Sequence, residues 1–224
     1  SSRGQVEELS LVNPTDNYIL LLDGEELAGA KQNRVINTSI MAAPKSSLKL
    51  PVSCTEEGRW SYNSNNFEDS GNVMPLRARY NKKSSVDFSL KSSGNYRSDQ
   101  SQVWDDISTI RSVLGSESPT GAMKDVYAER SSKLEEFVGA FEPGEGQTGM
   151  VVLVDGDVVV MELFSKASAL RSLYSKLIKS YGMHVLVENP PAAEMPNTYS
   201  VANFKESLQA LDSHGYKSIG EGWD

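Results

Sequence analysis

The most regular pattern in the chain is MVVLVDGDVVVM, at residues 150–161. Two runs of mostly β-branched residues flank Asp155-Gly156-Asp157, and an Asp-Gly pair between such runs is typical of a β-hairpin turn. Two aspartates beside a glycine also resemble part of a calcium loop, but the hairpin turn accounts for the same residues. Because the runs are apolar on both faces, they are expected to be covered on both sides. We therefore predict that this hairpin lies in the centre of a sheet and is largely buried.

Shorter strand candidates precede the hairpin in the first half of the chain. They are apolar runs separated by Asn, Asp, Gly and Pro, at residues 6–12, 18–22, 35–41 and 47–54. Residues 61–100 are rich in Ser and Asn, and only Val86 to Leu90 alternates there as a half-buried strand. We expect the rest of that segment to form long loops.

Helical spacing begins after residue 100. Apolar residues share one helix face from Val103 to Leu114, and Gly115 is placed to end that helix. A longer helix is expected from Met123 to Phe141, a third from Leu170 to Tyr181, and a short last one around Phe204 to Leu211.

Strands that come early and helices that come later favour an α+β fold over a parallel doubly wound sheet. We expect one domain over residues 1–224, built on a mostly antiparallel sheet with three to four helices. Its strands are concentrated in the N-terminal half, with the hairpin at 150–161 added in the middle of the sheet.

Composition excludes several classes of function. The formal net charge is −8, which argues against non-specific binding to nucleic acid and against docking on anionic lipid. The single cysteine permits no disulfide within the chain, and no apolar run approaches the ~20 residues that span a bilayer. These features predict a cytoplasmic protein. The sequence lacks HExxH, paired CxxC and GxSxG, and two histidines cannot form a histidine-rich metal site. We therefore predict no metal site, although an all-carboxylate site for Mg²⁺ or Ca²⁺ stays open, and the residues identify no cofactor.

The densest group of polar residues and glycines is DGEELAGAKQNR, at residues 23–34. Glu26 is suited to be a general base or metal ligand, while Lys31 and Arg34 are suited to hold a phosphate or carboxylate. Gln32 offers both a donor and an acceptor. Two alternatives stay open: a solvated hairpin loop, and a structural role for the glycines and Asn33. The group matches neither the P-loop nor the dinucleotide glycine pattern.

Two further segments contain candidate residues. In Cys54–Trp60, a thiol, two carboxylates, the Arg59 guanidinium and the Trp60 indole could together bind a nucleotide, with Trp60 stacked on its base. We expect Cys54 to be a buried structural thiol, because no histidine lies near it in sequence to activate it. Asp99 is suited to cap the helix that follows it. The alternative role for this segment places Gln100 at a helix N-terminus that faces an anion.

These same segments resemble a known family. The chain is similar to the ARPP-1 family, the "ARG and rhodanese-phosphatase-superfamily-associated protein" domain, over roughly residues 6–185. The resemblance lies in Leu21–Asn37, Pro51–Cys54, Glu57–Trp60, Ser98–Gln100, Val103-Trp104, Ser118–Ala122, and Leu163-Phe164 through Ser180-Tyr181. The family name implies, by association, a role near ADP-ribose or NAD-derived nucleotides. The resemblance also implies that members of the family have sequence before the position of Val6 and beyond that of Trp223, so the chain is expected to be shortened at both ends.

These observations lead to a hypothesis of function with two rivals. The leading hypothesis is a domain that binds or processes a small anionic nucleotide, with Glu26, Lys31, Gln32 and Arg34 at the centre of the site. Arg59, Trp60 and Gln100 are secondary candidates. The first rival is a non-enzymatic module that presents a flat surface around Trp60 to a protein partner of unspecified kind. The second is a scaffold, which predicts that Gln32, Asn33 and Arg34 are buried and bonded to backbone.

Overall fold

The computed structural model describes residues 7–62, 64–189, 198–211 and 215–222. Val6 and Trp223, the positions beyond which the family is expected to have further sequence, lie outside these ranges. The main sheet has five antiparallel strands in the order β1-β6-β4-β3-β7. Their bounds are β1 Glu8–Asn13, β3 Glu25–Gly29, β4 Arg34–Ile36, β6 Ser46–Cys54 and β7 Phe67–Val73. Strands β2 (Ile19–Leu21) and β5 (Ile40–Ala42) pair beside it as a separate two-stranded sheet. The predicted α+β class with early antiparallel strands is therefore confirmed.

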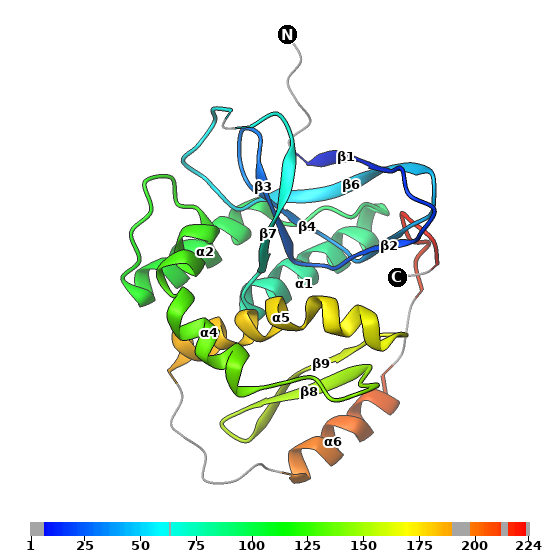
Figure 1. Ribbon diagram of the computed structural model, residues 1–224, viewed down its shortest axis with the longest axis vertical. Helices are drawn as coiled ribbons and strands as arrows, with labels where there is room; N and C mark the ends of the chain where they lie inside the picture. Colours follow the sequence, from blue (N-terminus) through cyan, green and yellow to red (C-terminus); the bar gives the residue numbers. More distant parts are fainter. Residues whose placement is uncertain (1–6, 63, 190–197, 212–214, 223–224) are drawn as a thin grey trace.

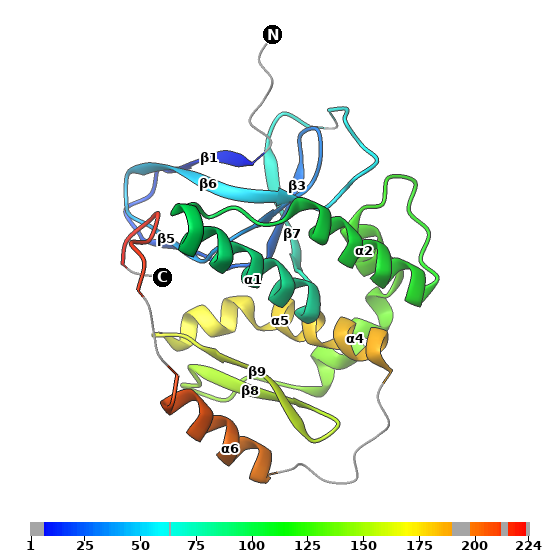
Figure 2. The ribbon, with the colours of Figure 1, turned by 180° about the vertical axis from the view of Figure 1, so that it is seen from behind.

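The helices are α1 Leu76–Ser93, α2 Gln100–Leu114, α3 Met123–Glu129, α4 Ser131–Ala140, α5 Ala167–Glu188 and α6 Thr198–Gln209. In Figures 1 and 2, α1 and α2 lie along the main sheet, and α5 runs between that half of the molecule and a lower hairpin that α6 flanks. Among the described residues, no helix is both long enough and apolar enough to cross a membrane.

The caps of α2 confirm the local prediction. The Asp99 carboxylate accepts hydrogen bonds from the backbone N–H groups of Ser101 and Gln102, which have no partner inside the helix. Gly115 ends the helix with a φ of 62°, in the left-handed region that favours glycine.

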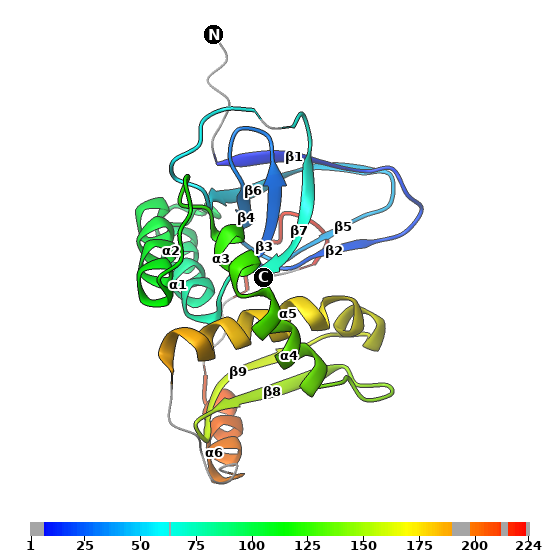
Figure 3. The same cartoon turned by 60° about the vertical axis from the view of Figure 1, so that its left-hand side comes forward.

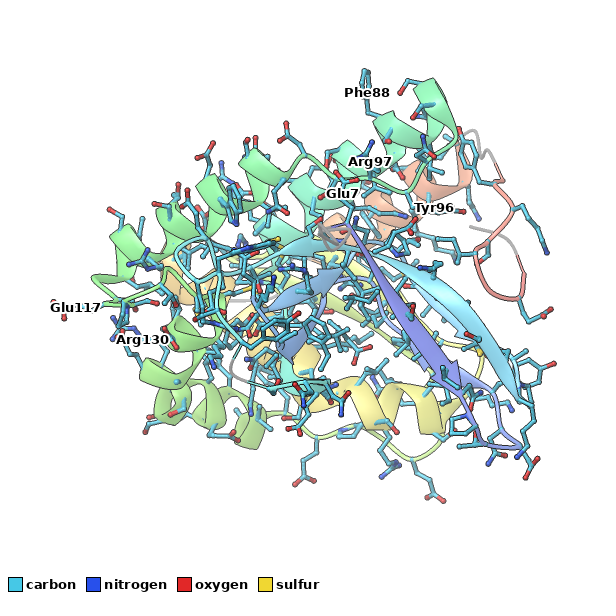
Figure 4. The ribbon with its side chains drawn as sticks, turned by 90° about the horizontal axis from the view of Figure 1, so that it is seen from above. Glu7, Phe88, Tyr96, Arg97, Glu117 and Arg130 are labelled. Atoms are coloured by element: carbon cyan, nitrogen blue, oxygen red, sulfur yellow. The ribbon has the colours of Figure 1, made fainter. Side chains whose placement is uncertain are left out.

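The prediction for residues 61–100 is wrong, because this segment contains β7 and the helix α1. Val86 to Leu90 lies inside that helix rather than in a strand. The buried face of α1 carries Ala78, Lys82, Val86 and Leu90, four residues apart, and one of the four is a lysine. The lysine interrupts the apolar stripe. Phe88 is 73% exposed, but between Val86 and Leu90 it places an apolar residue at every second position, as in a strand. Figure 4 shows Phe88 projecting outward from α1.

The single long helix predicted from Met123 to Phe141 is two helices, so the chain has more helices than expected. The chain leaves helical geometry at Arg130, between α3 and α4. The Arg130 guanidinium donates a hydrogen bond to the carbonyl of Leu114 at the end of α2. Arg130, labelled in Figure 4, therefore connects the junction between α3 and α4 to the C-terminal end of α2.

The hairpin at 150–161 forms as predicted, but its placement in the central sheet is wrong. Among the residues that the structure describes, strands β8 (Gly149–Val154) and β9 (Asp157–Leu163) pair only with each other. Positive φ angles of 50° at Asp155 and 81° at Gly156 fit the turn chemistry of a two-residue hairpin. One face of the hairpin packs on the core around α5, and α6 packs against β9. Both faces are apolar because helices approach both, but none of the strand residues is fully buried and Met161 is 40% exposed. The prediction that the hairpin is largely buried is therefore also wrong.

Candidate functional site

The predicted polar block forms the β3–β4 hairpin and its turn. Register pairs Glu26 with Val35 and Leu27 with Arg34. Gly29 has a φ of 139°, and a Cβ built there would lie 2.3 Å from the backbone oxygen of Asn66. Glycine is therefore required at this position both by backbone angle and by space.

Gln32, Asn33 and Glu56 form a buried network under this turn. The Gln32 side-chain amide donates to the Glu56 carbonyl at 2.9 Å, and the Asn33 side-chain oxygen accepts the Gly29 N–H at 3.1 Å. The Glu56 carboxylate accepts the Asn33 N–H at 3.2 Å and the Thr120 hydroxyl at 2.7 Å. Glu56 thus ties the turn to the segment after β6 and to the loop before α3.

Arg34 lies inside this network rather than on the surface. It is 5% exposed, and its Nη1 donates to the Gln32 side chain and the Asn33 carbonyl, both at 3.2 Å. No described carboxylate pairs with it, and burial lowers the pKa of its guanidinium. Gln32, Asn33 and Arg34 are therefore buried and bonded largely to backbone, as the scaffold hypothesis predicts.

Arg59 is the cation that neutralises Glu56, with 2.6 Å between Nη2 and Oε2. Burial by itself would raise the pKa of Glu56, but the hydrogen bonds from Arg59, Thr120 and the Asn33 backbone outweigh it and lower that pKa. Arg59 also donates to the Ala30 carbonyl at 2.6 Å. The guanidinium is thus committed to contacts that hold the turn.

Lys31 and Trp60 lie together outside the network. The Lys31 ammonium is 5.3 Å from the Trp60 ring centroid and 5.1 Å from that of Tyr62. Trp60 is 56% exposed and Tyr62 is 68% exposed. The three side chains form an exposed cation–aromatic cluster, which we call the Trp60 surface.

Gln100 and Cys54 contact each other. Both ends of the Gln100 amide bond the backbone of Cys54, at 2.7 and 2.9 Å, where β6 extends past the end of its pairing with β1. Cys54 is 1% exposed, and burial raises the pKa of its thiol, so the predicted buried position is confirmed. That it is not catalytic stays a prediction.

Glu26 is the predicted residue with the most unusual environment. It is fully buried, and its carboxylate accepts the Thr55 hydroxyl at 2.8 Å and the Asn72 amide at 3.5 Å. Burial raises its pKa to about 7 despite these hydrogen bonds. No lysine or arginine among the described residues forms an ion pair with it. The predicted residues therefore divide between a buried network, an exposed cluster, the Gln100 contact with Cys54 and this isolated carboxyl. They do not come together in one site.

Sequence reasoning missed a cavity of about 630 Å³ between α1 and β9. Figure 2 shows the two elements that form its walls, with α5 beside them. Leu76, Val159, Val160 and Met161 make an apolar wall, and the remaining lining is polar and charged: Asp23, Thr38, Ser39, Arg77, Arg79, Tyr80, Lys83, Glu162 and His184. We call it the α1–β9 cavity.

A buried charge network forms the floor of this cavity. Lys82 is 0% exposed, pairs with Asp23, and donates to the Ile36 and Asn37 carbonyls at 2.9 and 3.0 Å. Arg79 bridges Asp23, at 3.2 Å, and Glu162. Burial lowers the pKa of Lys82 despite Asp23, whereas the two carboxylates outweigh burial and raise the pKa of Arg79. The network holds the charged Arg79 guanidinium in a fixed position at the floor of the cavity.

The rim of the α1–β9 cavity carries two more cations. Arg77 pairs with Glu188 at 3.0 Å and its side chain is 71% exposed, while Lys83 pairs with Asp87 at 3.7 Å and is 40% exposed. Such exposed pairs contribute little stability and exchange readily for another anion. Tyr80 beside them is 70% exposed. Burial lowers the pKa of His184, which favours the neutral form of this side chain.

Comparisons with known proteins give one result. No curated protein and no solved structure matches the chain. Within residues 7–62, 64–189, 198–211 and 215–222, no group of three or more His, Cys, Asp and Glu side chains is placed to hold a metal ion. The model of the family described as "ARG and Rhodanese-Phosphatase-superfamily-associated Protein domain" matches residues 1–224. Because this match spans the whole chain, the chain belongs to the ARPP-1 family.

Proposed function

We propose that this protein binds a small phosphate-bearing ligand of nucleotide type, in the class of ADP-ribose and NAD-derived nucleotides, in the α1–β9 cavity. The observation that carries the proposal is the association of Arg77, Arg79 and Lys83 with an apolar wall in one cavity. Its volume of about 630 Å³ is in the range of small-molecule sites. The family name, which refers to the ARG and rhodanese-phosphatase superfamily, supports the same class of ligand by association.

The cations are suited to a diphosphate. Arg79 is held in place by Asp23 and Glu162, so binding a ligand does not require the entropy cost of ordering this side chain. Arg77 and Lys83 can exchange their exposed partners for phosphate oxygens. On a chain of net charge −8, such a local positive site selects a small anion while the rest of the surface repels polyanions.

The apolar wall is suited to a base. Val159 and Met161 line the side opposite the α1 cations, and Tyr80 offers an exposed ring on the α1 side. Aromatic rings stack on nucleobases of any sequence because every base presents a flat face. The cavity therefore supplies one environment for phosphate and another for the base.

Substitution of Arg77 or Lys83 by alanine is expected to weaken ADP-ribose binding about tenfold each, because each change removes one charged hydrogen bond to phosphate. Calorimetric titration of wild type and the two variants measures the effect. Lys133→Ala is the matched control, since Lys133 is an exposed lysine of α4 that pairs with Glu136. Saturable binding that neither Arg77→Ala nor Lys83→Ala weakens would place the ligand elsewhere. Absence of binding to ADP-ribose, NAD and AMP would reject the proposal.

The Trp60 surface favours a second candidate function, binding of a protein partner. Its aromatic rings are exposed, and Trp60 and Tyr62 are residue types that concentrate binding energy at interfaces. The earlier hypothesis instead assigns Lys31, Arg34 and Trp60 to the nucleotide.

Titration with ADP-ribose separates these roles. If Lys31 and Arg34 hold phosphate, Lys31→Ala and Arg34→Lys each weaken binding by roughly tenfold or more. If they do not, both variants keep the wild-type affinity, and Arg34→Lys lowers only the melting temperature because lysine cannot reproduce its two 3.2 Å contacts. In that second outcome Trp60→Ala also leaves the affinity for ADP-ribose unchanged. The result would then favour binding of a protein partner at the Trp60 surface.

A further inference from the structure

A second cavity, of about 300 Å³, lies between β7 and the helices α3, α4 and α5. Figure 3 shows these helices passing beside β7. Its polar lining comes from Ser70, Asn72, Lys124, Ser131 and Lys179. None of these residues belongs to the α1–β9 cavity, so the two cavities have separate walls.

We propose that this second cavity binds a single tetrahedral oxyanion, either inorganic phosphate or the terminal phosphate of a monoester, between Lys124 and Lys179. Two ammonium groups on one cavity present six N–H donors and no acceptor. In the part of the chain that the structure describes, Lys124 has no ion-pair partner. Lys179 pairs at 2.6 Å with Glu135, whose side chain is 58% exposed. The positive charge of the cavity is thus only partly neutralised by the protein.

Neutral donors complete the site. The Ser131 hydroxyl lines the same cavity as the two lysines, and so do the Ser70 hydroxyl and the Asn72 amide, which also hydrogen-bond the Glu26 carboxylate. Tyr127 also lines it, but its hydroxyl donates to the Val73 carbonyl at 2.6 Å and is committed to the fold. Hydroxyl and amide donors around two lysines match the acceptor-only oxygens of phosphate or sulfate. An uncharged polar ligand would leave the Lys124 ammonium without an anion.

Glu26 lies behind Asn72 and would repel an anion if it were ionised. The groups that face it are Thr55, Ser70 and Asn72, with Lys124 and Tyr127 as the charged and titratable ones. Burial raises the pKa of Glu26 to about 7, so its neutral and ionised forms coexist near neutral pH. Anion binding and protonation of Glu26 therefore favour each other, and the anion should bind more tightly at pH 6 than at pH 8.

Titration with sulfate tests the proposal, because sulfate stays a dianion between pH 6 and pH 8, so its own charge does not change with pH. Wild type is expected to bind saturably, and Lys124→Ala to bind about tenfold more weakly. Lys133→Ala, a change of an exposed α4 lysine outside the cavity, should leave the affinity unchanged. Glu26→Gln should remove the difference between pH 6 and pH 8. Arg77→Ala, at the α1–β9 cavity, should also have no effect, which separates this site from the proposed nucleotide site.

Three results would overturn the proposal: no saturable sulfate or phosphate binding, an equal loss in Lys124→Ala and Lys133→Ala, or a loss in Arg77→Ala alone. If Lys124→Ala fails to fold by circular dichroism, Lys179→Gln is the second variant and carries the same expectation. Parallel titrations with inorganic phosphate and phosphoserine identify the source of the anion. Tighter binding of inorganic phosphate assigns the site to the free ion, and tighter binding of phosphoserine assigns it to a monoester.

Discussion

Replacing Asp23 with asparagine is expected to lower the free energy of unfolding by about 3–5 kcal/mol. The Asp23 carboxylate is the anionic partner of Lys82, whose side chain is 0% exposed, and it also bonds Arg79. Asparagine leaves the buried Lys82 ammonium without a counterion, facing only neutral oxygens: the amide oxygen of the new side chain and the Ile36 and Asn37 carbonyls. A buried charge without its counterion is much more costly than the loss of one hydrogen bond. Urea denaturation of wild type and variant measures the difference.

The double variant Asp23→Asn/Lys82→Met supplies the control. Methionine has a similar length and no charge, so the double variant should recover part of the stability that Asp23→Asn alone loses. The two single losses would simply add if each residue acted alone. Additive losses, or a cost below about 1 kcal/mol for Asp23→Asn, would contradict the role of this pair.

Glu26 is expected to make stability fall between about pH 4.5 and pH 7. Its pKa is raised from 4.5 to about 7 in the folded protein, because the carboxyl is fully buried. Below pH 4.5 it is protonated in both the folded and unfolded states. As the pH rises, the unfolded state ionises first, and stability is lost until the folded carboxyl ionises as well. The shift corresponds to roughly 3 kcal/mol.

Urea denaturation of wild type and Glu26→Gln at pH 4.5, 6 and 8 measures this contribution. Glutamine cannot ionise, so the stability of the variant relative to wild type should rise by roughly 3 kcal/mol across this range. Taking the difference between the two proteins cancels the titration of the other groups. Glu68→Gln, at an exposed glutamate of β7, is the matched control for the change of glutamate to glutamine. A difference between wild type and Glu26→Gln that stays constant with pH would mean that the Glu26 pKa is normal.

Both predictions concern charges that hold or adjoin the proposed sites. Loss of Asp23 removes one of the two carboxylates that hold Arg79 at the floor of the α1–β9 cavity, so the variant should also bind nucleotide more weakly. Glu26 adjoins the second cavity through Asn72. The stability and binding experiments can therefore be made on the same proteins.

Local chemistry was sufficient for the features that depend on neighbours in sequence. Asp155-Gly156 predicts the hairpin turn and Asp99 with Gly115 predicts the ends of α2, because a turn or cap is decided by backbone angles and by bonds over a few residues. The density of polar residues in Gln32–Arg34 also marked a region of unusual structure. Its alternative role as a scaffold was identified from the sequence, but its partner Glu56 lies 23 residues beyond Asn33.

Only the tertiary structure decided the features that depend on distant partners. Lys82 lies on the buried face of α1 because Asp23, 59 residues earlier in the chain, neutralises its charge. A reader of the sequence cannot see this partner, so a lysine among the apolar residues hides the helical pattern. Arg79 is joined to Asp23 and Glu162 over separations of 56 and 83 residues, so no local pattern locates the α1–β9 cavity. The hairpin at 150–161 is apolar on both faces, which sequence alone assigns to a central sheet. Whether helices or neighbouring strands cover an apolar face depends on packing, since burial of apolar area is not directional.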